Sequence, residues 1–292
     1  MAALPPLVAP VYRADVVDLW PRVLSITASG TPTQGVEQEA NLAKAGVARE
    51  LAAKVAGDAA IADLVAFLRA HDPDGAWFSG SNRARDLGLD DDLAIGLVVL
   101  AGEWEGSGAR ERQVGLALHL AAAAEFDVGV DALPADGPAR ATADQLLAAH
   151  GPALRMFLRL QYERTQAFVA EPVVAFRGVI MRDPPRGPLA RIQPLRAPLS
   201  SFSLDGHIGE SFPMYSPTDV APAAYVVLMA QVPPERILTT PVTGFASLHE
   251  QEIVVVGASA ADEAWCFVGA DGGRVALGST DAFWQQVLAA AP

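Results

Sequence analysis

The sequence predicts an α+β fold in which a helical N-terminal region is followed by a strand-rich C-terminal domain. Two features of the 292-residue chain predict it. Apolar residues recur at spacings of three and four before Pro172, and runs of β-branched and aromatic residues between turn residues follow it. Because the strands come after the helices instead of alternating with them, a doubly wound parallel sheet is not expected.

Helix formers and capping residues predict the helices of the first half. Ala, Glu, Leu and Lys fill residues 36–55, Gly57 suits the position after a helix end, and Asp58 can cap the next helix. The apolar spacing predicts further helices over residues 59–70, after the acidic run at 90–92, and over residues 110–126.

A linker rich in Pro and Gly, residues 128–140, precedes two more expected helices. Thr142 with Gln145 three residues later forms a capping box, which predicts a helix start. Gly151-Pro152 predicts the end of that helix, and residues 153–170 form the next one.

The pattern changes to that of strands after Glu171-Pro172. Residues 173–180 alternate, residues 199–205 are extended, and Ala270-Asp271-Gly272-Gly273 predicts a hairpin turn. Further strands are expected at residues 224–231, 252–256, 265–268 and 274–277, and a short helix at 280–290.

The composition excludes several classes of protein. A net charge of −13 disfavours binding to nucleic acid through its phosphates, and the single Cys266 cannot form an internal disulfide. No uncharged apolar stretch of about 18 residues occurs, and the N-terminus lacks a basic segment followed by an apolar one. We expect a protein without a membrane span or signal peptide, cytoplasmic as synthesised, with a specialised secretion route as the alternative.

Sequence motifs for metals and for phosphate loops are absent. The five histidines include no pair at i,i+4 and no neighbouring cysteine, and neither GxxxxGK[ST], GxGxxG before a helix, nor GxSxG occurs. One local feature of this acidic chain suits an anionic ligand, with scattered surface charge as the alternative. It is a group of five arginines: Arg177, Arg182, Arg186, Arg191 and Arg196.

Arginine and serine residues mark the first two segments with candidate chemistry. Arg177 lies in an otherwise apolar strand, where a guanidinium is costly to bury unless an anion such as pyrophosphate binds it. An arginine near a strand end that reaches water or a structural carboxylate is the alternative. Ser201 and Ser203 share one side of an extended segment, where they suit a ligand or a carboxylate; an ordinary edge strand is the alternative.

Two glutamates mark the third segment. Glu250 and Glu252 open a buried strand, and their spacing predicts that they share one face of it. Paired carboxylates suit a reaction that passes through an oxocarbenium ion, because one stabilises the positive charge while the other handles the nucleophile. A solvated strand end is the alternative.

In this order, Phe176-Arg177-Gly178, Ser201-Phe202-Ser203 and Glu250-Gln251-Glu252 resemble the motifs of the R-S-E class of ADP-ribosyltransferases. The resemblance spans residues 173–257, under a third of the chain. Residues 208–212 stand where the family has a short helix with a phenylalanine. Phe202 departs from the family pattern, in which Thr is common between the two serines.

The resemblance implies a role for each motif residue. Arg177 binds the pyrophosphate of NAD, and the backbone of Gly178 approaches the nicotinamide amide. Ser201 holds Glu252, which bonds the ribose hydroxyls and stabilises the positive charge as nicotinamide leaves. Glu250 orients and helps to deprotonate the acceptor, which in this family is typically an arginine.

Three further residues belong to the implied site. Ser203 and Phe212 contact NAD, Phe212 by stacking on nicotinamide, and Phe245 contacts the protein target. A place in the hydrophobic core is the alternative for both aromatic residues.

The family also implies a fold and partners. Residues 139–292 form an ADP-ribosyltransferase-like split β-sandwich catalytic domain, two small packed sheets around an NAD cleft, and residues 1–138 form a helical N-terminal region. NAD is the co-substrate and no metal is expected. The partners are a target protein with an acceptor arginine and, as for bacterial toxins and effectors, a cognate inhibitor or immunity protein. An NAD glycohydrolase, a nucleic-acid-directed transferase and a non-catalytic binding module are the alternatives.

Overall fold

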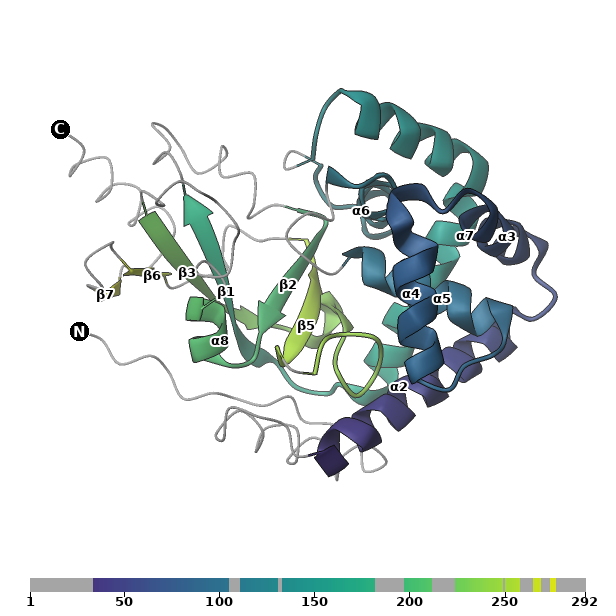
Figure 1. The fold of residues 1–292 in the computed structure, drawn as a ribbon. Helices are drawn as coiled ribbons and strands as arrows, with labels where there is room; N and C mark the ends of the chain where they lie inside the picture. Colours follow the sequence, from purple (N-terminus) through teal and green to yellow (C-terminus); the bar gives the residue numbers. More distant parts are fainter. Residues whose placement is uncertain are drawn as a thin grey trace.

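The computed structural model describes residues 34–104, 111–130, 133–181, 197–211, 224–248, 250–257, 265–268 and 274–276. Its helices precede its antiparallel strands, so the predicted α+β class is confirmed. Figure 1 shows the long helices gathered on one side of the molecule and the strands on the other.

The helices and strands have the following bounds. The helices are α2 (Gln34–Val55), α3 (Ala59–His71), α4 (Ala76–Asp86), α5 (Asp92–Trp104), α6 (Gln113–Phe126), α7 (Pro138–Phe168) and α8 (Gly206–Ser211), with short 3-10 turns η1 (Pro73–Gly75) and η6 (Pro234–Arg236). The strands are β1 (Val173–Met181), β2 (Leu199–Ser203), β3 (Ala224–Val232), β4 (Ile237–Thr239), β5 (Glu252–Val256), β6 (Trp265–Val268) and β7 (Arg274–Ala276). The helix expected at 280–290 lies outside the described residues.

The start of α3 confirms the predicted cap. The carboxylate of Asp58 accepts hydrogen bonds from the backbone N–H groups of Ala60 and Ile61, at 2.9 and 3.1 Å. These are donors that a helix N-terminus otherwise leaves without an intrahelical acceptor.

The helix α4 is not predicted by its residues, which include two serines, a glycine and an asparagine. Its packing on α5 explains it. A Cβ added at Gly80 would lie only 2.6 Å from the Cα of Val99, so the glycine permits a close approach of the two helices. Tertiary contact here outweighs weak helix propensity.

The expectation of two helices separated at Gly151-Pro152 is wrong, because α7 continues through both residues. Pro152 removes one hydrogen bond of the helix, but Gly151 has no Cβ, so one of the clashes between a proline ring and the preceding residue is absent. Thr142 also lies inside this helix, where its hydroxyl donates to the carbonyl of Pro138 at 3.1 Å. The helix therefore starts earlier than the capping box predicts.

The strands form one antiparallel series in the order β4-β5-β2-β1-β3-β6-β7, where two packed sheets were expected. β1 is registered with β3 along its whole length. Between β1 and β2, in contrast, the described residues show a single registered pair, Phe176 with Ser203. The series is therefore nearly divided into two halves, β4-β5-β2 and β1-β3-β6-β7, joined at that pair.

The helices and the β4-β5-β2 half share one hydrophobic core. Leu199, Leu238 and Val254 belong to the same buried cluster as the apolar residues of α2 to α7. The predicted boundary at 138/139 falls at the start of α7, which packs on α3, α6 and β4, and it stays a prediction. None of the helices in the described ranges combines the length and the apolar content needed to cross a membrane.

Candidate active site

The three motif segments lie on three adjacent strands. Arg177 belongs to β1, Ser201 and Ser203 to β2, and Glu252 is the first residue of β5, with β2 between the other two. Phe176 is registered with Ser203, and Ser203 in turn with Glu252. Residues separated by up to about 75 positions in the sequence therefore lie on neighbouring strands. Phe176, Ser203 and Glu252 form one cross-strand row, and Arg177, the next residue of β1, alternates to the side of Phe202.

Arg177 lies directly beyond the single β1–β2 pair. Its Nη1 donates to the backbone carbonyl of Ser201 at 2.9 Å, and its guanidinium carbon lies 5.9 Å from the ring centroid of Phe202. The side chain thus bonds a carbonyl of β2 at the place where the backbone of β1 has stopped pairing with it. A guanidinium has five donor hydrogens in a planar arrangement, which is the chemistry that pairs with phosphate oxygens.

Ser203, not Ser201, is the serine directly opposite Glu252. The hydroxyl of Ser203 donates to the backbone carbonyl of Glu250 at 2.7 Å and accepts from the N–H of Asp205 at 3.0 Å. Ser201 is registered with Val254 instead. Ser201 is thus not opposite Glu252, and its implied role of holding the Glu252 carboxylate stays a prediction. Ser203 instead fixes the turn that leads into β5.

Glu252 is buried, with 2% of its surface exposed. Its Oε2 accepts from the backbone N–H of Ser247 at 2.8 Å, and its own N–H donates to the carbonyl of Ser247 at 2.9 Å. A buried carboxylate needs donors of this kind, and a carboxylate with a fixed orientation suits interaction with a developing positive charge.

The prediction that Glu250 and Glu252 share one face of an extended strand is wrong. Gln251 between them has a φ of 44°, in the left-handed region, and its N–H donates to the carbonyl of Leu248 at 3.0 Å. The chain turns at these residues and becomes extended only from Glu252 onward. Glu250 is half-buried in the turn, so the two carboxylates have different surroundings.

The short helix implied at residues 208–212 is found as α8, at Gly206–Ser211. It packs on β1 at the joint, because a Cβ on Gly209 would lie 2.7 Å from the Cβ of Phe176. Gly178 follows Arg177 in β1 and is registered with Val227 of β3. Phe212 and four of the five clustered arginines (Arg182, Arg186, Arg191 and Arg196) lie outside the described residues.

Phe245 does not have the exposed position that contact with a protein target requires. It is 3% exposed and belongs to the hydrophobic core, and its N–H donates to Thr239 Oγ1 at 3.2 Å. Residues 240–246 are all buried. The reason is that this segment packs against α7 instead of projecting from the surface.

Sequence reasoning missed the polar residues of α7 that hold this segment, Gln161, Arg164 and Thr165. All three contact Thr243. The available signal was their spacing of three and four, which places them on one face of a helix together with buried apolar residues.

No family model, curated protein or solved structure matches the chain. Within the described ranges, no group of three or more His, Cys, Asp or Glu side chains is placed to hold a metal ion.

Proposed function

We propose that the chain is a mono-ADP-ribosyltransferase that cleaves NAD and transfers ADP-ribose to a target, with an ADP-ribosyltransferase-like catalytic domain formed around the β1–β2 joint. The observation that supports the proposal is that Arg177, the two serines and Glu252 lie on the neighbouring strands β1, β2 and β5, with Glu250 in the turn that leads into β5. Each motif alone is common. Here three such motifs lie on or next to adjacent strands, near the point where strand pairing stops, and they supply one guanidinium, two hydroxyls and two carboxylates.

The residues fit NAD chemically. The planar guanidinium of Arg177 pairs with phosphate oxygens, and the buried carboxylate of Glu252 accepts from ribose hydroxyls. NAD supplies the ADP-ribosyl group, which is released when the bond between C1′ and the nicotinamide nitrogen breaks and its electron pair leaves with nicotinamide. Glu252 stabilises the positive charge that develops on the ribose.

The different surroundings of the two glutamates suit two roles. Buried Glu252 acts on the bond that breaks. Half-buried Glu250 accepts the proton of the incoming nucleophile, whose nitrogen or oxygen forms the new bond to C1′. An arginine acceptor suits this site because a guanidinium pairs well with a carboxylate.

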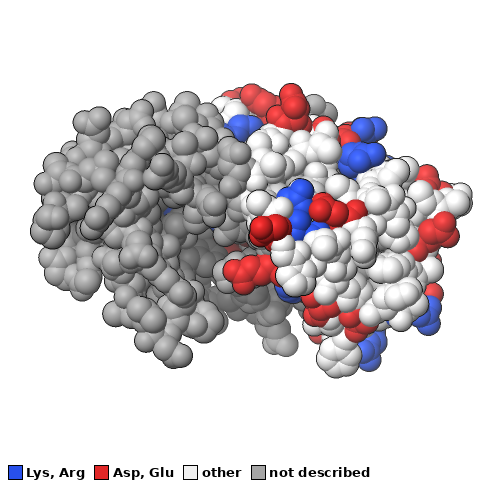
Figure 2. Space-filling view, turned by 90° about the horizontal axis from the view of Figure 1, so that it is seen from above, with Lys and Arg blue, Asp and Glu red and all other residues white. Residues whose placement is uncertain are grey.

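An NAD glycohydrolase, with water as the acceptor, is the second candidate. The burial of Phe245 and of residues 240–246 favours it, because the segment expected to contact a protein target is held against α7. A nucleic-acid acceptor receives less support: acidic and basic side chains are interspersed on the described part of the face in Figure 2, and the net charge is −13.

Labelled NAD tests the proposal. The purified protein is incubated with NAD labelled in its ADP-ribose part, together with cell lysate, DNA or RNA in separate reactions. Label on protein supports the transferase, and free labelled ADP-ribose supports the glycohydrolase. Label on nucleic acid would redirect the choice of acceptor, and NAD that stays intact in every reaction would contradict an NAD-cleaving enzyme.

A further inference from the structure

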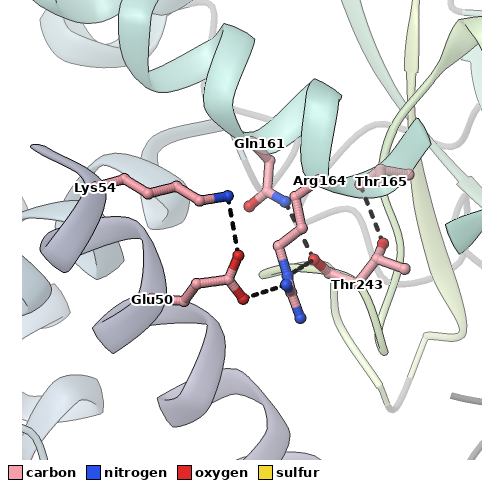
Figure 3. Close-up of polar contacts among 6 residues, drawn as sticks. All are labelled: Glu50, Lys54, Gln161, Arg164, Thr165 and Thr243. Carbon is pink, nitrogen blue, oxygen red and sulfur yellow. Dashed lines mark hydrogen bonds and ion pairs between the residues drawn. The ribbon is translucent and has the colours of Figure 1, made fainter. Parts of the chain in front are cut away.

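Three side chains from one turn of α7 converge on Thr243. Gln161 Nε2 and Arg164 Nε both donate to its backbone carbonyl, at 3.3 and 3.1 Å, and Thr165 Oγ1 shares a hydrogen bond with its hydroxyl at 3.1 Å. Figure 3 shows these side chains pointing from the helix to the same residue. We call Gln161, Arg164 and Thr165 the α7 clamp.

The clamp is also tied to α2. The Nη1 of Arg164 forms an ion pair with Glu50 Oε2, and Lys54 Nζ lies 3.0 Å from Glu50 Oε1. Burial by itself would raise the pKa of Glu50, but the hydrogen bond from Lys54 and the charges of Arg164 and Lys54 bring that pKa below its ordinary value. Glu50 therefore stays charged at neutral pH and fixes the far side of the Arg164 guanidinium.

The clamped segment leaves little room for movement. Gln161, Thr165 and Thr243 are each 0% exposed. A Cβ on Gly244 would lie 2.0 Å from Thr239 Oγ1 and 2.4 Å from Gln161 Nε2, so only glycine fits against the clamp. Thr243 Oγ1 also bonds Thr240 Oγ1 at 2.8 Å, which closes the turn from within.

The segment held in this way leads directly to Glu252. Ser247, four residues after Thr243, donates its N–H to the Glu252 carboxylate. Between the two positions Phe245 is anchored in the core. The clamp therefore fixes the segment that carries one hydrogen-bond donor of the carboxylate, the N–H of Ser247.

We propose that Gln161, Arg164 and Thr165 are positioning residues for the carboxylate of Glu252, and that the helical region thereby completes the catalytic site. This inference rests on the proposed function, in which Glu252 stabilises positive charge on the ribose. Displacement of such a group by about 1 Å costs on the order of 10²-fold in rate, so distant residues that fix it matter for catalysis.

The test compares Arg164→Ala with Arg159→Ala. Arg159 lies on the same helix and pairs with Glu125 at 2.6 Å, outside the clamp, with 59% of its side chain exposed. The measurements are kcat and KM for nicotinamide release from NAD, and hydrogen exchange at the amides of Ser247 and Glu252. Arg164→Lys keeps the charge toward Glu50 and carries the test if Arg164→Ala does not fold.

We expect Arg164→Ala to lower kcat by roughly 10- to 100-fold with KM nearly unchanged, and to speed exchange at Ser247. Arg164→Lys should recover part of kcat, and Arg159→Ala should match the wild type. In a Glu252→Gln background, Arg164→Ala should cause no further loss, because it acts through the carboxylate that is already gone.

Two results would overturn the clamp as a positioning device: an unchanged kcat in folded Arg164 variants, or the same fold-loss with and without the Glu252 carboxylate. Absence of nicotinamide release by the wild type would contradict the proposed function instead. Hydrogen exchange then tests the clamp independently of activity. Faster exchange at the Ser247 amide in the Arg164 variant supports the clamp, and unchanged exchange overturns it.

Discussion

Arg177 is a half-buried residue of β1 that follows the single registered pair between β1 and β2. Its guanidinium bonds the Ser201 carbonyl that β1 no longer pairs with, beside the ring of Phe202. It thereby stabilises the edge of β2. Under the proposed function the same side chain also binds the pyrophosphate of NAD, and the two roles are separable by experiment.

We expect Arg177→Ala to weaken NAD binding by roughly 2–4 kcal/mol, because a charge-assisted contact to phosphate is lost from a half-buried site. Titration calorimetry with NAD measures this difference, and circular dichroism shows whether the variant is folded. Arg159→Ala is the matched control. A folded Arg177→Ala protein with the dissociation constant of the wild type would make Arg177 a structural residue only.

Glu103 of α5 makes the stability of the molecule depend on pH. It is 3% exposed, and burial raises its pKa to about 7, opposed by the charge of Arg112 at 3.3 Å and assisted by the charges of Asp74 and Asp72. Because the folded state favours the neutral acid, its contribution to stability is present below the ordinary pKa of 4.5 and is lost as pH rises through about 7.

Glu103→Gln should therefore raise the free energy of unfolding at pH 8 by up to about 3 kcal/mol relative to the wild type, and by much less near pH 5. The amide resembles the neutral acid in shape and carries no charge to bury. Urea unfolding at the two pH values measures the difference. An equal effect at both would mean that burial of the Glu103 charge does not set the pH dependence.

At the scale of helices and strands, the elements with a regular sequence pattern were predictable, and those that depend on contacts with other elements were not. The bounds of β5 follow from its run of apolar β-branched residues, and the Asp58 cap follows from its side-chain chemistry. The existence of α4 depends on the close contact of Gly80 with Val99 of α5, and the continuity of α7 on the missing Cβ of Gly151 before Pro152. Local propensity does not contain that information.

The same distinction applies to the candidate site, where the sequence predicted some features and not others. Residue types and their order predicted which side chains form the candidate site, and the strand order places their segments on or next to adjacent strands; the site itself stays a prediction. The positive φ of Gln251 was not predictable from the spacing of the glutamates. The burial of Phe245 confirms the hydrophobic-core alternative for that residue. A spacing of two residues implies a shared face only where the backbone is extended.

The contact between α7 and the segment before Glu250 gives a prediction for Gly244. Gly244→Ala should lower the free energy of unfolding by about 1–3 kcal/mol, because the new Cβ overlaps Thr239 and Gln161 in a packed interior. Gly46→Ala is the control. Nothing lies within 4 Å of its added Cβ, so alanine in the interior of α2 should stabilise by up to about 1 kcal/mol.

Denaturant unfolding of the two alanine variants measures both effects. A Gly244→Ala protein as stable as the wild type would show that the segment has room to move away from α7. The clamp would then hold Thr243 less firmly than its hydrogen bonds indicate.

At the scale of the whole molecule, the helical region shares one hydrophobic core with β2, β4 and β5. Leu199 at the start of β2 donates its N–H to Nδ1 of buried His119 in α6, at 3.3 Å, and the core runs from α2 to β5. The helices thus support β2, β4 and β5 directly, whereas β1 meets β2 at one pair.

The most direct test of this account is the rate at which Glu252→Gln releases nicotinamide from NAD with water as the acceptor. The account predicts a loss on the order of 10²–10³-fold relative to the wild type, because the amide keeps the shape of the side chain but not the charge that faces the ribose. Glu250→Gln, measured in parallel, should retain hydrolysis and lose transfer to arginine. Hydrolysis by folded Glu252→Gln at the wild-type rate would contradict the assignment of the site.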